Sequence, residues 1–398
     1  MLKSNIYYDP IEYLREIIDE YSSIFSTDIF SHREHEIAFN WISANLSHFI
    51  PNLPFNLHEQ FSKNVKWHQS WAQIDQNYLH LVDTTNIKDH QNILKKASSK
   101  SPYIFCTFHL GSYRLINFIL ASNKIPFNLI TDDNYIKSQG EYSKLLFDNA
   151  LNKFYNKSLE EVTPIDILNA ENPNIAFEAS RKLKEGCSLL FYIDGNTGVG
   201  GVLHNKEKNV KINFLNHEIY ARKGIAFISY LTNTPIVPVI NLRTGWLDRE
   251  THILPPIHPN KDISRNEYID STTKSLYKIF ETYLKKYPEQ WEGWFYIHKF
   301  MSSKPKGKNN KQGFHEYMID VDKDYIFNFE YFGLMDYNIK KCLLHKSTFE
   351  TSIIDDTLFK TLSLFKSGIT YNQLKQINNL PFEQFEELIK LNLIILKK

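Results

Sequence analysis

The chain has 398 residues, which is too long for one ordinary domain and predicts two or three folded units. Apolar residues make up 42% and charged residues 23%, a balance that excludes wholesale disorder and allows a sizeable core. Because 46 Lys and Arg nearly cancel 45 Asp and Glu, the composition does not support a general nucleic-acid-binding surface, and we expect no nucleic-acid partner.

Cysteine usage and the N-terminal residues bear on where the protein works. Cys106, Cys187 and Cys342 are far apart, so we expect neither a CxxC zinc or redox motif nor a disulfide framework. The first residues reach Pro10 and several charges too early for a signal peptide. No run of about 18 apolar residues occurs. We therefore expect a cytoplasmic protein without a membrane span, with association at the inner membrane surface left open.

Residues 1–95 are predicted to form a helical region packed on the core that follows. Apolar residues recur there at helical spacing, at Ile11, Leu14, Ile17 and Ile18 and again at Trp67, Trp71, Ile74, Tyr78 and Leu81. Such stripes are typical of helices whose apolar face meets a core, and we interpret them so rather than as ligand-binding boxes.

The pattern changes at Ser101, where short apolar runs begin to alternate with helical stretches. Strand-like runs occupy 103–108, 127–131, 188–194 and 235–240, and helical patterns occupy 113–122, 177–184, 221–232 and 270–286. Strands that alternate with helices predict an α/β fold with parallel strand pairs. We therefore expect residues 96–302 to form a mixed, largely parallel sheet flanked by helices.

A second folded part is predicted beyond residue 302. Residues 303–313 are rich in Lys, Gly, Asn and Ser, which indicates an exposed, mobile linker. Residues 314–398 begin with a strand-like piece at 325–332 and continue with helix, turn, helix, helix and a terminal strand. This order predicts a small α+β, winged-helix-like module that is separable from the core.

The first loop with chemical potential follows the strand predicted at 103–108. His109 comes directly after this strand, and Gly111 and Ser112 then open a helix. Ligands of open α/β sheets bind beyond the carboxyl ends of the strands, and the amides at a helix start can hold an oxyanion. The spacing alone leaves a second reading open, in which His109 caps the helix or bonds locally.

The second loop follows the strand predicted at 188–194. Asp194 ends that strand, and four of the next seven residues are glycine. Such a loop lets the backbone approach a ligand closely. It is not a phosphate-binding P-loop, because no Gly-Lys-Ser/Thr follows. A purely structural glycine-rich turn remains the alternative reading.

Other signals are weaker. The sequence has no HExxH, and His32 and His35 lack an evident third ligand, so we expect no metal site and no cofactor. Ser112 has no GxSxG context and is not predicted to be a nucleophile. Three lysines form a basic cluster at Lys206, Lys208 and Lys211. This cluster is either a solvated loop or a contact for an acidic carrier protein or anionic lipid.

Four sequence blocks occur in an order that is specific over about half of the chain. They are FCTFHLGSYRLI, ASRKLKEGCSLLFYIDGNTG, INFLNHEIYARKGIAFISYLTNTPIVPV and YLKKYPEQWEGWFYIHKFM. Together they make the segment 101–302 resemble the lysophospholipid acyltransferase superfamily, especially the bacterial lipid A lauroyl/myristoyl acyltransferase branch. The resemblance implies transfer of a fatty acyl group from acyl carrier protein or acyl-CoA to a hydroxyl or amine of a lipid or a peptide-like intermediate.

The resemblance also implies roles for residues. His109 stands where the family has its catalytic base, and Arg222 stands where the third block often carries a basic residue. Substrate contacts are expected from Gly111, Ser112, Tyr113, Arg114, Gly195, Asn196, Thr197 and Arg222. Amides near Gly111 and Ser112, together with Arg114, would stabilise the oxyanion.

One departure from the family pattern changes the expected mechanism. The family has Asp or Glu five positions after the histidine, where this chain has Arg114. The acid then comes from elsewhere, with Asp194 the best candidate, or His109 works alone. Arg114 would lower the pKa of His109 and offer donors to an oxyanion or a phosphate. A non-catalytic homologue that binds an acyl chain or a peptide is the alternative function.

Both ends of the chain also depart from the lipid A branch. The apolar anchor with which that branch usually begins is not found in residues 1–95. The stretch 355–396 loosely resembles PqqD-like or winged-helix modules that grip peptides in natural-product pathways. Acidic residues at Glu383, Glu386 and Glu387 make DNA binding the poorer reading of this module.

Overall fold

The computed structural model describes residues 9–98, 100–155, 165–195, 209–303, 305 and 319–397. The chain divides into two compact units, Met1–Ser26 with Lys63–Ser302 (unit 1) and Thr27–Ser62 with Ser303–Lys398 (unit 2). Each unit is therefore built from two separate stretches of sequence. This grouping differs from the predicted boundaries, because Thr27–Ser62 clusters with the C-terminal residues, whereas the sequence pattern assigns all of 1–95 to the core. Nearly all of the predicted linker lies outside the described residues.

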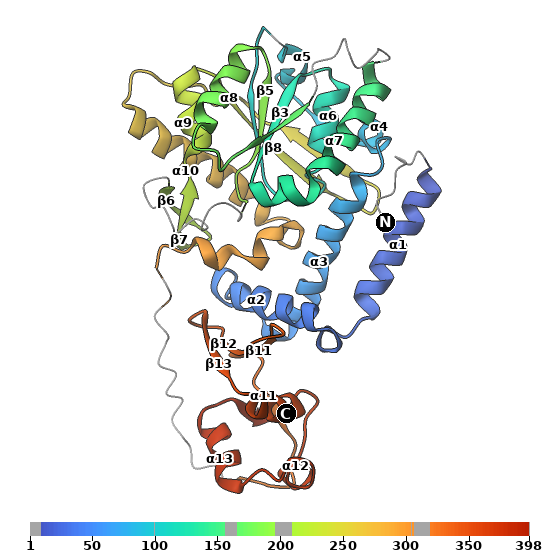
Figure 1. Cartoon of the computed structure of the whole chain (residues 1–398), viewed down its shortest axis with the longest axis vertical. Helices are drawn as coiled ribbons and strands as arrows, with labels where there is room; N and C mark the ends of the chain where they lie inside the picture. Colours follow the sequence, from blue (N-terminus) through green and yellow to red (C-terminus); the bar gives the residue numbers. More distant parts are fainter. Residues whose placement is uncertain are drawn as a thin grey trace. The chain divides into compact units, whose positions relative to one another are not determined.

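Unit 1 is built, within its described residues, on a seven-stranded sheet (Figure 1). In spatial order its strands are β1 (Asn86–Lys88), β9 (Arg249–Ile253), β8 (Ile236–Arg243), β2 (Ile104–Thr107), β5 (Ser188–Tyr192), β3 (Phe127–Thr131) and β4 (Asp166–Asn169). The strands from β8 to β4 run parallel to one another, whereas β9 is antiparallel to β8 and β1 is parallel to β9. The prediction of a mixed, largely parallel α/β sheet is confirmed.

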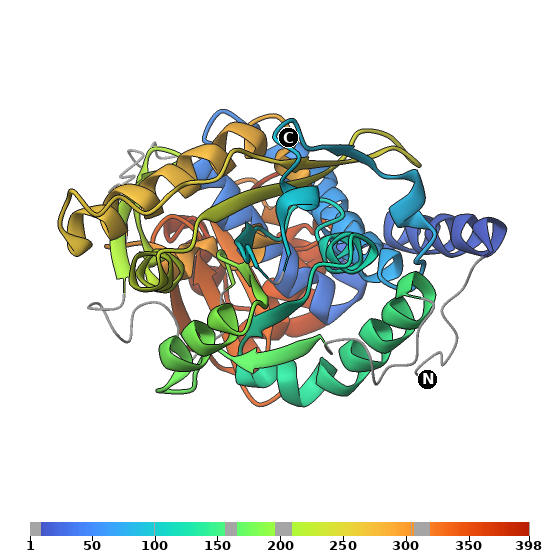
Figure 2. The same ribbon diagram turned by 90° about the horizontal axis from the view of Figure 1, so that it is seen from above.

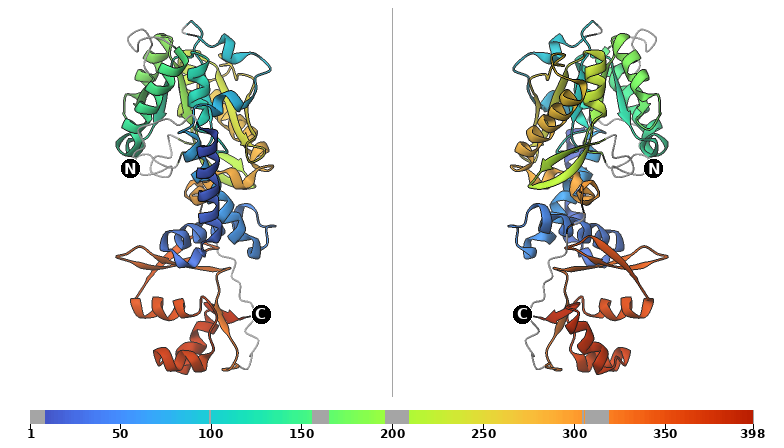
Figure 3. Two further views of the ribbon diagram at one scale, coloured as in Figure 1. Left: turned by 90° about the vertical axis from the view of Figure 1, so that its right-hand side faces the viewer. Right: turned by 90° about the vertical axis from the view of Figure 1, so that its left-hand side faces the viewer.

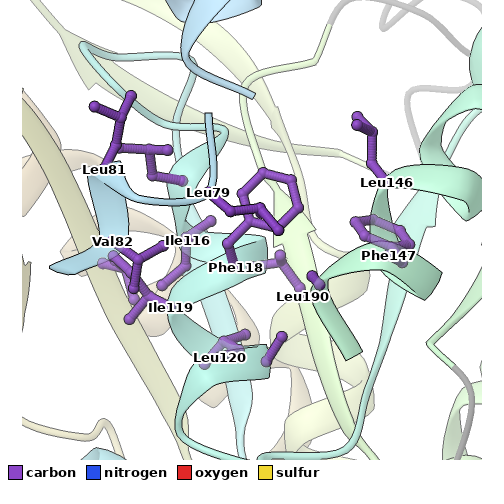
Figure 4. Close-up of a cluster of buried hydrophobic side chains, with 14 of the residues drawn as sticks. Leu79, Leu81, Val82, Ile116, Phe118, Ile119, Leu120, Leu146, Phe147 and Leu190 are labelled. Carbon is purple, nitrogen blue, oxygen red and sulfur yellow. The ribbon is translucent and has the colours of Figure 1, made fainter. Parts of the chain in front are cut away.

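Helices cover both faces of this sheet (Figures 2 and 3). The helices of unit 1 are α1 (Pro10–Ser26), α4 (Leu81–Thr84), α5 (Ile93–Lys96), α6 (Leu115–Ser122), α7 (Asp133–Tyr155), α8 (Ile175–Lys184), α9 (Gly224–Thr232) and α10 (Arg265–Leu284). Figure 4 shows the core on one face, where Phe118 of α6, Phe147 of α7 and Leu190 of β5 come together. On the other face, α9 packs against α8 and α10. Burial of apolar side chains on both faces is what an alternating α/β sequence predicts.

A hairpin in unit 1 escaped the sequence analysis. Strands β6 (Asn209–Phe214) and β7 (His217–Arg222) pair antiparallel, and Leu215 and Asn216 form the turn with positive φ angles of 48° and 63°. This turn matches the right-handed twist of a hairpin. Because β7 continues to Arg222, α9 begins three residues later than the predicted helix at 221–232.

Unit 2 consists of helices and two small sheets. Its elements are η1 (Ile29–Ser31), α2 (Arg33–Phe49), η2 (Phe55–Leu57), β10 (Tyr325–Phe327), β11 (Phe332–Asp336), β12 (Lys341–His345), β13 (Glu350–Ile354), α11 (Asp356–Leu364), α12 (Tyr371–Asn378), α13 (Phe382–Lys390) and β14 (Ile394–Leu396). Strand β10 pairs with β14, and β11, β12 and β13 form an antiparallel sheet in that order. Helix α3 (His58–Asp75) begins in unit 2 and ends in unit 1.

Helix α2 belongs to unit 2 because its apolar stripe packs on β11 and β12. Ala44 is fully buried against Met335 and Leu344. The side-chain amide of Asn40 donates to the carbonyl oxygen of Leu334 at 2.8 Å. A Cβ at Gly333 would lie 2.6 Å from the Asn40 side chain, so only glycine allows this close approach.

A buried lysine joins the same two stretches of unit 2. Lys346 is 1% exposed, and its Nζ donates to Ser43 Oγ at 3.0 Å and to the carbonyl oxygen of Phe329 at 2.6 Å. Ser43 Oγ lies 3.0 Å from Nδ1 of His58, whose Nε2 lies 3.2 Å from the carbonyl oxygen of Leu53. Burial lowers the pKa of Lys346 to about 7 and that of His58 to about 4. Removing the side chain of Lys346, Ser43 or His58 would leave buried polar atoms without hydrogen-bond partners, which destabilises the folded state.

A buried polar network fastens the N-terminal helix of unit 1 to the sheet. Arg243 Nη2 pairs with Asp75 Oδ2 at 2.5 Å, and both side chains are almost fully buried. Tyr13 donates to Asp75 Oδ1 at 2.9 Å and accepts from Trp71 Nε1 at 2.8 Å. Arg249 reaches the Tyr13 hydroxyl at 3.4 Å. Helices α1 and α3 are thereby joined to the ends of β8 and β9.

Truncation after residue 302 tests this division of the chain. Residues 1–302 expressed alone should aggregate or unfold at lower temperature, because Ala44, Asn40 and Ser43 lose their partners. Co-expression of residues 303–398 should restore a soluble complex, as measured by size-exclusion chromatography and thermal unfolding. A monodisperse 1–302 fragment as stable as the full chain would instead support the separable module that the sequence predicts.

Candidate active site

The parallel pairing of β2 and β5 brings His109 and Asp194 together. Thr107 and Tyr192 are register partners, and the amide of Ile193 donates to the carbonyl oxygen of Thr107 at 3.0 Å. His109 and Asp194 each lie two residues beyond those partners. Nδ1 of His109 is 2.8 Å from Asp194 Oδ1, and the backbone amide of His109 lies 3.2 and 3.1 Å from the two carboxylate oxygens.

A segment that follows α10 lies against the His109 loop at the strand ends and covers Asp194 there. This closing segment, Pro288–Trp294, contains the 3-10 turn η5 (Pro288–Gln290) and the start of η6 (Glu292–Phe295), and η7 (Ile297–Phe300) follows. The amide of Glu292 donates to the carbonyl oxygen of His109, and the amide of Gly111 donates to that of Gln290, both at 3.1 Å. Trp291 Nε1 donates to Asp194 Oδ2 at 2.7 Å. The sequence block YPEQWEGW marks this segment, but sequence reasoning assigned no site role to its residues.

Gly111 allows the His109 loop to lie directly against β8. Its φ is +60°, and a Cβ there would lie 2.6 Å from the carbonyl oxygen of Asn241 and 2.9 Å from Gln290 Oε1. Gln290 in turn bonds the backbone of Arg243 through both ends of its amide, at 2.9 and 2.7 Å. The Gly111 amide, which the sequence analysis offered as an oxyanion donor, is therefore occupied by the bond to Gln290.

Ser112 and the helix start remain close to His109. Helix α6 begins at Leu115, and the Leu115 amide donates to the carbonyl oxygen of Ser112 at 3.0 Å. The Ser112 hydroxyl is buried and has no hydrogen-bond partner among the described residues. A buried hydroxyl without a partner is costly to the folded state, so this group is available to a bound molecule.

Arg114 is only partly exposed to solvent. Its Nη1 donates to Gln76 Oε1 at 2.9 Å, and its guanidinium lies over the ring of Tyr113 at 5.3 Å. Burial lowers the pKa of Arg114, but the combined effect of Tyr113, Tyr135, Glu292 and Tyr192 is larger and raises it. The guanidinium therefore belongs to the wall of the site.

The environment of His109 raises the pKa of its imidazole. Burial alone lowers this pKa, but the charge and the hydrogen bond of Asp194, with a further contribution from Glu292, outweigh it. Arg114 acts in the direction that the sequence analysis expects, since it lowers the pKa of His109, but its effect is the smallest of these. The net charge effect on His109 is thus set by the two carboxylates.

Two tyrosine rings flank the imidazole. The rings of Tyr113 and Tyr192 have centroids 4.9 and 5.0 Å from that of His109. Tyr113 donates to Glu292 Oε1 at 2.7 Å, and Asn117 Nδ2 donates to the Tyr192 hydroxyl at 3.1 Å. With Nδ1 bound to Asp194, Nε2 of His109 has no partner among the described residues, and the side chain is 22% exposed. Neutral His109 in this arrangement has a free acceptor at Nε2.

The structure describes only some of the remaining residues that were predicted to contact substrate. A Cβ at Gly195 would lie 3.9 Å from Cε1 of His109, so this glycine borders the imidazole. Asn196 and Thr197 lie outside the described residues. Arg222 ends β7, where burial lowers its pKa against the effects of nearby Tyr277 and acidic groups. It is not a hydrogen-bond partner of His109 or Asp194.

Other site types find little support in the described residues. No three His, Cys, Asp or Glu side chains converge there as metal ligands, and the three cysteines are free and buried. Lys206 and Lys208 are not described, and Lys211 pairs with Glu218 at 2.8 Å. None of the described helices combines the length and the apolar run needed to cross a bilayer.

Comparison with known proteins gives a weak likeness to a solved structure. No family model and no curated protein sequence matches this chain. Among solved structures, the chain is similar to the crystal structure of the 1-acyl-sn-glycerophosphate (LPA) acyltransferase PlsC from Thermotoga maritima, with a TM-score of 0.31 and 14% sequence identity. The match covers 64% of this chain and 96% of that chain.

The Asp194→Asn variant tests the electrostatics of the site without any assumption about function. Asparagine keeps the shape of the side chain but removes the charge that raises the pKa of His109. Burial and Arg114 then dominate, so the pKa of His109 should fall below the ordinary histidine value of about 6.5. An NMR titration of the His109 Cε1 proton measures it. An unchanged pKa would show that Asp194 does not control the imidazole.

Proposed function

We propose that this chain is an acyltransferase that uses His109 as a general base, oriented by Asp194. The fatty acyl group would come from the thioester of acyl carrier protein or acyl-CoA and pass to a hydroxyl or amine of a lipid or a peptide-like intermediate. The observation that carries the proposal is the 2.8 Å bond between His109 Nδ1 and the buried Asp194 carboxylate, which leaves Nε2 open. The four sequence blocks supply the choice of acyl transfer over other reactions of a histidine base.

The geometry supports a direct transfer. His109 Nε2 takes the proton of the acceptor O–H or N–H as the acceptor oxygen or nitrogen attacks the thioester carbonyl. The carbonyl π electrons move to oxygen, and they return as the C–S bond breaks. The leaving thiolate then takes the proton from the imidazolium. Asp194 stabilises the imidazolium, because its carboxylate faces the Nδ1–H in a site where water is largely excluded.

Charge that develops on the carbonyl oxygen needs donors. The buried Ser112 hydroxyl has no partner among the described residues, and it lies three residues after His109 at the start of α6. We assign it, with the amides of the Ser112–Arg114 turn, to the oxyanion. The Gly111 amide is excluded from this role while it is bonded to Gln290. Preorganised donors of this kind typically contribute about 10²–10³ in rate.

A covalent acyl-enzyme would require a nucleophilic side chain that His109 can deprotonate. Among the described residues, its hydrogen-bond partners include no serine, threonine or cysteine side chain. Cys106 lies in β2, but burial raises the pKa of its thiol and disfavours the reactive thiolate. Direct attack by the acceptor is therefore the simpler route for this site.

The alternative function is binding of an acyl chain or a peptide without catalysis. The argument for this alternative is that Arg114 stands where the resembled family has the carboxylate that pairs with its histidine. The pairing of His109 with Asp194 weakens that argument, because a carboxylate still holds Nδ1. We propose that the reaction takes place in the cytoplasm, where the inner membrane surface would supply lipid acceptors. We further propose that the C-terminal residues recognise a peptide or a carrier protein.

Replacement of His109 tests the proposed reaction. The full-length protein is incubated with acyl-CoA or acyl carrier protein thioesters and a panel of amine and hydroxyl acceptors, and products are read by intact mass. His109→Ala should lower kcat by about 10²–10⁴-fold in protein that is still folded, although the lost donor to the buried Asp194 lowers the unfolding temperature. His90→Ala serves as the control, because His90 is an exposed turn residue. Near-normal turnover in His109→Ala would remove His109 from the reaction.

Replacement of Arg114 tests whether the family motif can simply be restored. Arg114→Glu should not improve the enzyme, because Nδ1 of His109 is already bound and Glu292 lies nearby. Arg114→Ala should lower kcat or raise the donor KM by at least about tenfold, roughly 1.4 kcal/mol, since Gln76 loses its partner and the site wall loosens. Steady-state kinetics over a pH series measures both. A gain of activity in Arg114→Glu would contradict the role given to Asp194.

A further inference from the structure

We infer that Trp291 is the positioning residue of the site: its indole N–H fixes the Asp194 carboxylate, and thereby fixes the orientation of His109. The inference rests on the proposed function only for its effect on rate. The contact itself does not depend on that function: Trp291, 97 positions later in the chain, holds the buried carboxylate of Asp194 at the end of β5. The following contacts carry it.

Both oxygens of the Asp194 carboxylate are engaged. Oδ1 faces His109 Nδ1 at 2.8 Å, and Oδ2 accepts from Trp291 Nε1 at 2.7 Å. The backbone amide of His109 lies between them, 3.2 and 3.1 Å from the two oxygens. The side chain is 3% exposed, so little solvent is present to replace a lost donor. Without the indole, the donors left among the described residues would be the backbone amide and the imidazole of His109, and Oδ2 would lose its shortest hydrogen bond.

The direction of the indole N–H is set by packing. Trp291 is 1% exposed, and its ring lies edge-on to Phe214, Phe280 and Trp294 at centroid distances of 5.7, 5.4 and 5.2 Å. Phe108, which directly precedes His109, stacks on Phe280 at 3.9 Å. The indole and the His109 loop therefore rest on the same aromatic cluster, and neither moves far without disturbing the other.

Gly293 provides the room for the indole. A Cβ at this position would lie 2.1 Å from Cε2 and from Cζ2 of Trp291, far inside contact distance. The backbone of Gly293 does not have a positive φ, so the glycine is required by the neighbouring ring and not by its own conformation. A methyl group at Gly293 would displace the indole while leaving the tryptophan itself in place.

The closing segment keeps its other bonds when the indole N–H is lost. Gln290 accepts from the Gly111 amide, and the Glu292 amide donates to the carbonyl oxygen of His109. Trp291→Phe retains an aromatic ring in the cluster and leaves these backbone bonds intact. The variant therefore removes the positioning bond with the least change elsewhere.

The activity test uses the full-length chain and the acyl-transfer assay. Trp291→Phe and Gly293→Ala should each lower kcat roughly tenfold or more with KM nearly unchanged. In an Asp194→Asn background the same replacements should add less than about threefold, because the carboxylate they position is gone. Trp71→Phe is the matched control, since it also removes a buried indole donor, to Tyr13, but not one that meets Asp194. Equal losses with and without Asp194 would overturn the positioning role.

A second test does not require any turnover. In nitrogen-labelled protein, the proton on Nδ1 of His109 should exchange with water about tenfold faster or more in Trp291→Phe and Gly293→Ala than in Trp71→Phe. Wild-type exchange rates in both variants would overturn the inference. If Trp291→Phe does not fold, the indole N–H resonance of Trp291 is compared between the wild type and Asp194→Asn, and an unchanged shift contradicts the bond. If acyl transfer fails in the wild type while exchange behaves as expected, the proposed function fails and the positioning role stands.

Discussion

The structure of the site depends on one constraint, that a carboxylate buried at the edge of a sheet must have all of its acceptor capacity satisfied. Asp194 meets this requirement through the backbone and side chain of His109 and through Trp291. These donors come from two parts of unit 1, the His109 loop and the closing segment, so satisfying Asp194 also fixes where those two parts lie. The histidine is oriented as a consequence, and the closing segment is fastened at the same place. Gly111 lacks a Cβ where the His109 loop lies against β8 and the closing segment, and Gly293 lacks one where the Trp291 indole must fit.

Much of unit 1 could be predicted because it rests on local patterns. Short apolar runs that alternate with helical stretches gave the parallel strands, and the rule that ligands bind beyond strand ends singled out His109 and Asp194. The broken family motif at Arg114 also pointed to an acid elsewhere, and Asp194 was the acid at a neighbouring strand end. The distance and the tautomer could not be predicted, because they depend on the register Thr107 with Tyr192, which no sequence pattern gives.

The differences from the predictions, and the omissions, come from contacts between distant residues. Trp291 lies 97 residues from Asp194. From the sequence alone, its tryptophan-rich block is equally typical of ordinary hydrophobic core residues. Helix α2 has an ordinary amphipathic stripe, and only the presence of β11 and Lys346 shows that it groups with the C-terminal residues. Arg114 was expected to offer donors to an oxyanion or a phosphate, whereas its Nη1 donates to Gln76, 38 residues earlier in the chain. A single sequence contains no signal for any of these pairings.

Asp194, at the end of the neighbouring strand, holds the imidazole of His109, whose own loop carries no acid. The tautomer of neutral His109 tests this pairing most directly, because Asp194 can only accept a hydrogen bond from Nδ1. Nitrogen NMR of the labelled wild-type protein, recorded well above the pKa of His109, distinguishes the two ring nitrogens. We expect a protonated Nδ1 and an unprotonated Nε2. A protonated Nε2, with Nδ1 free of its proton, would contradict the pairing.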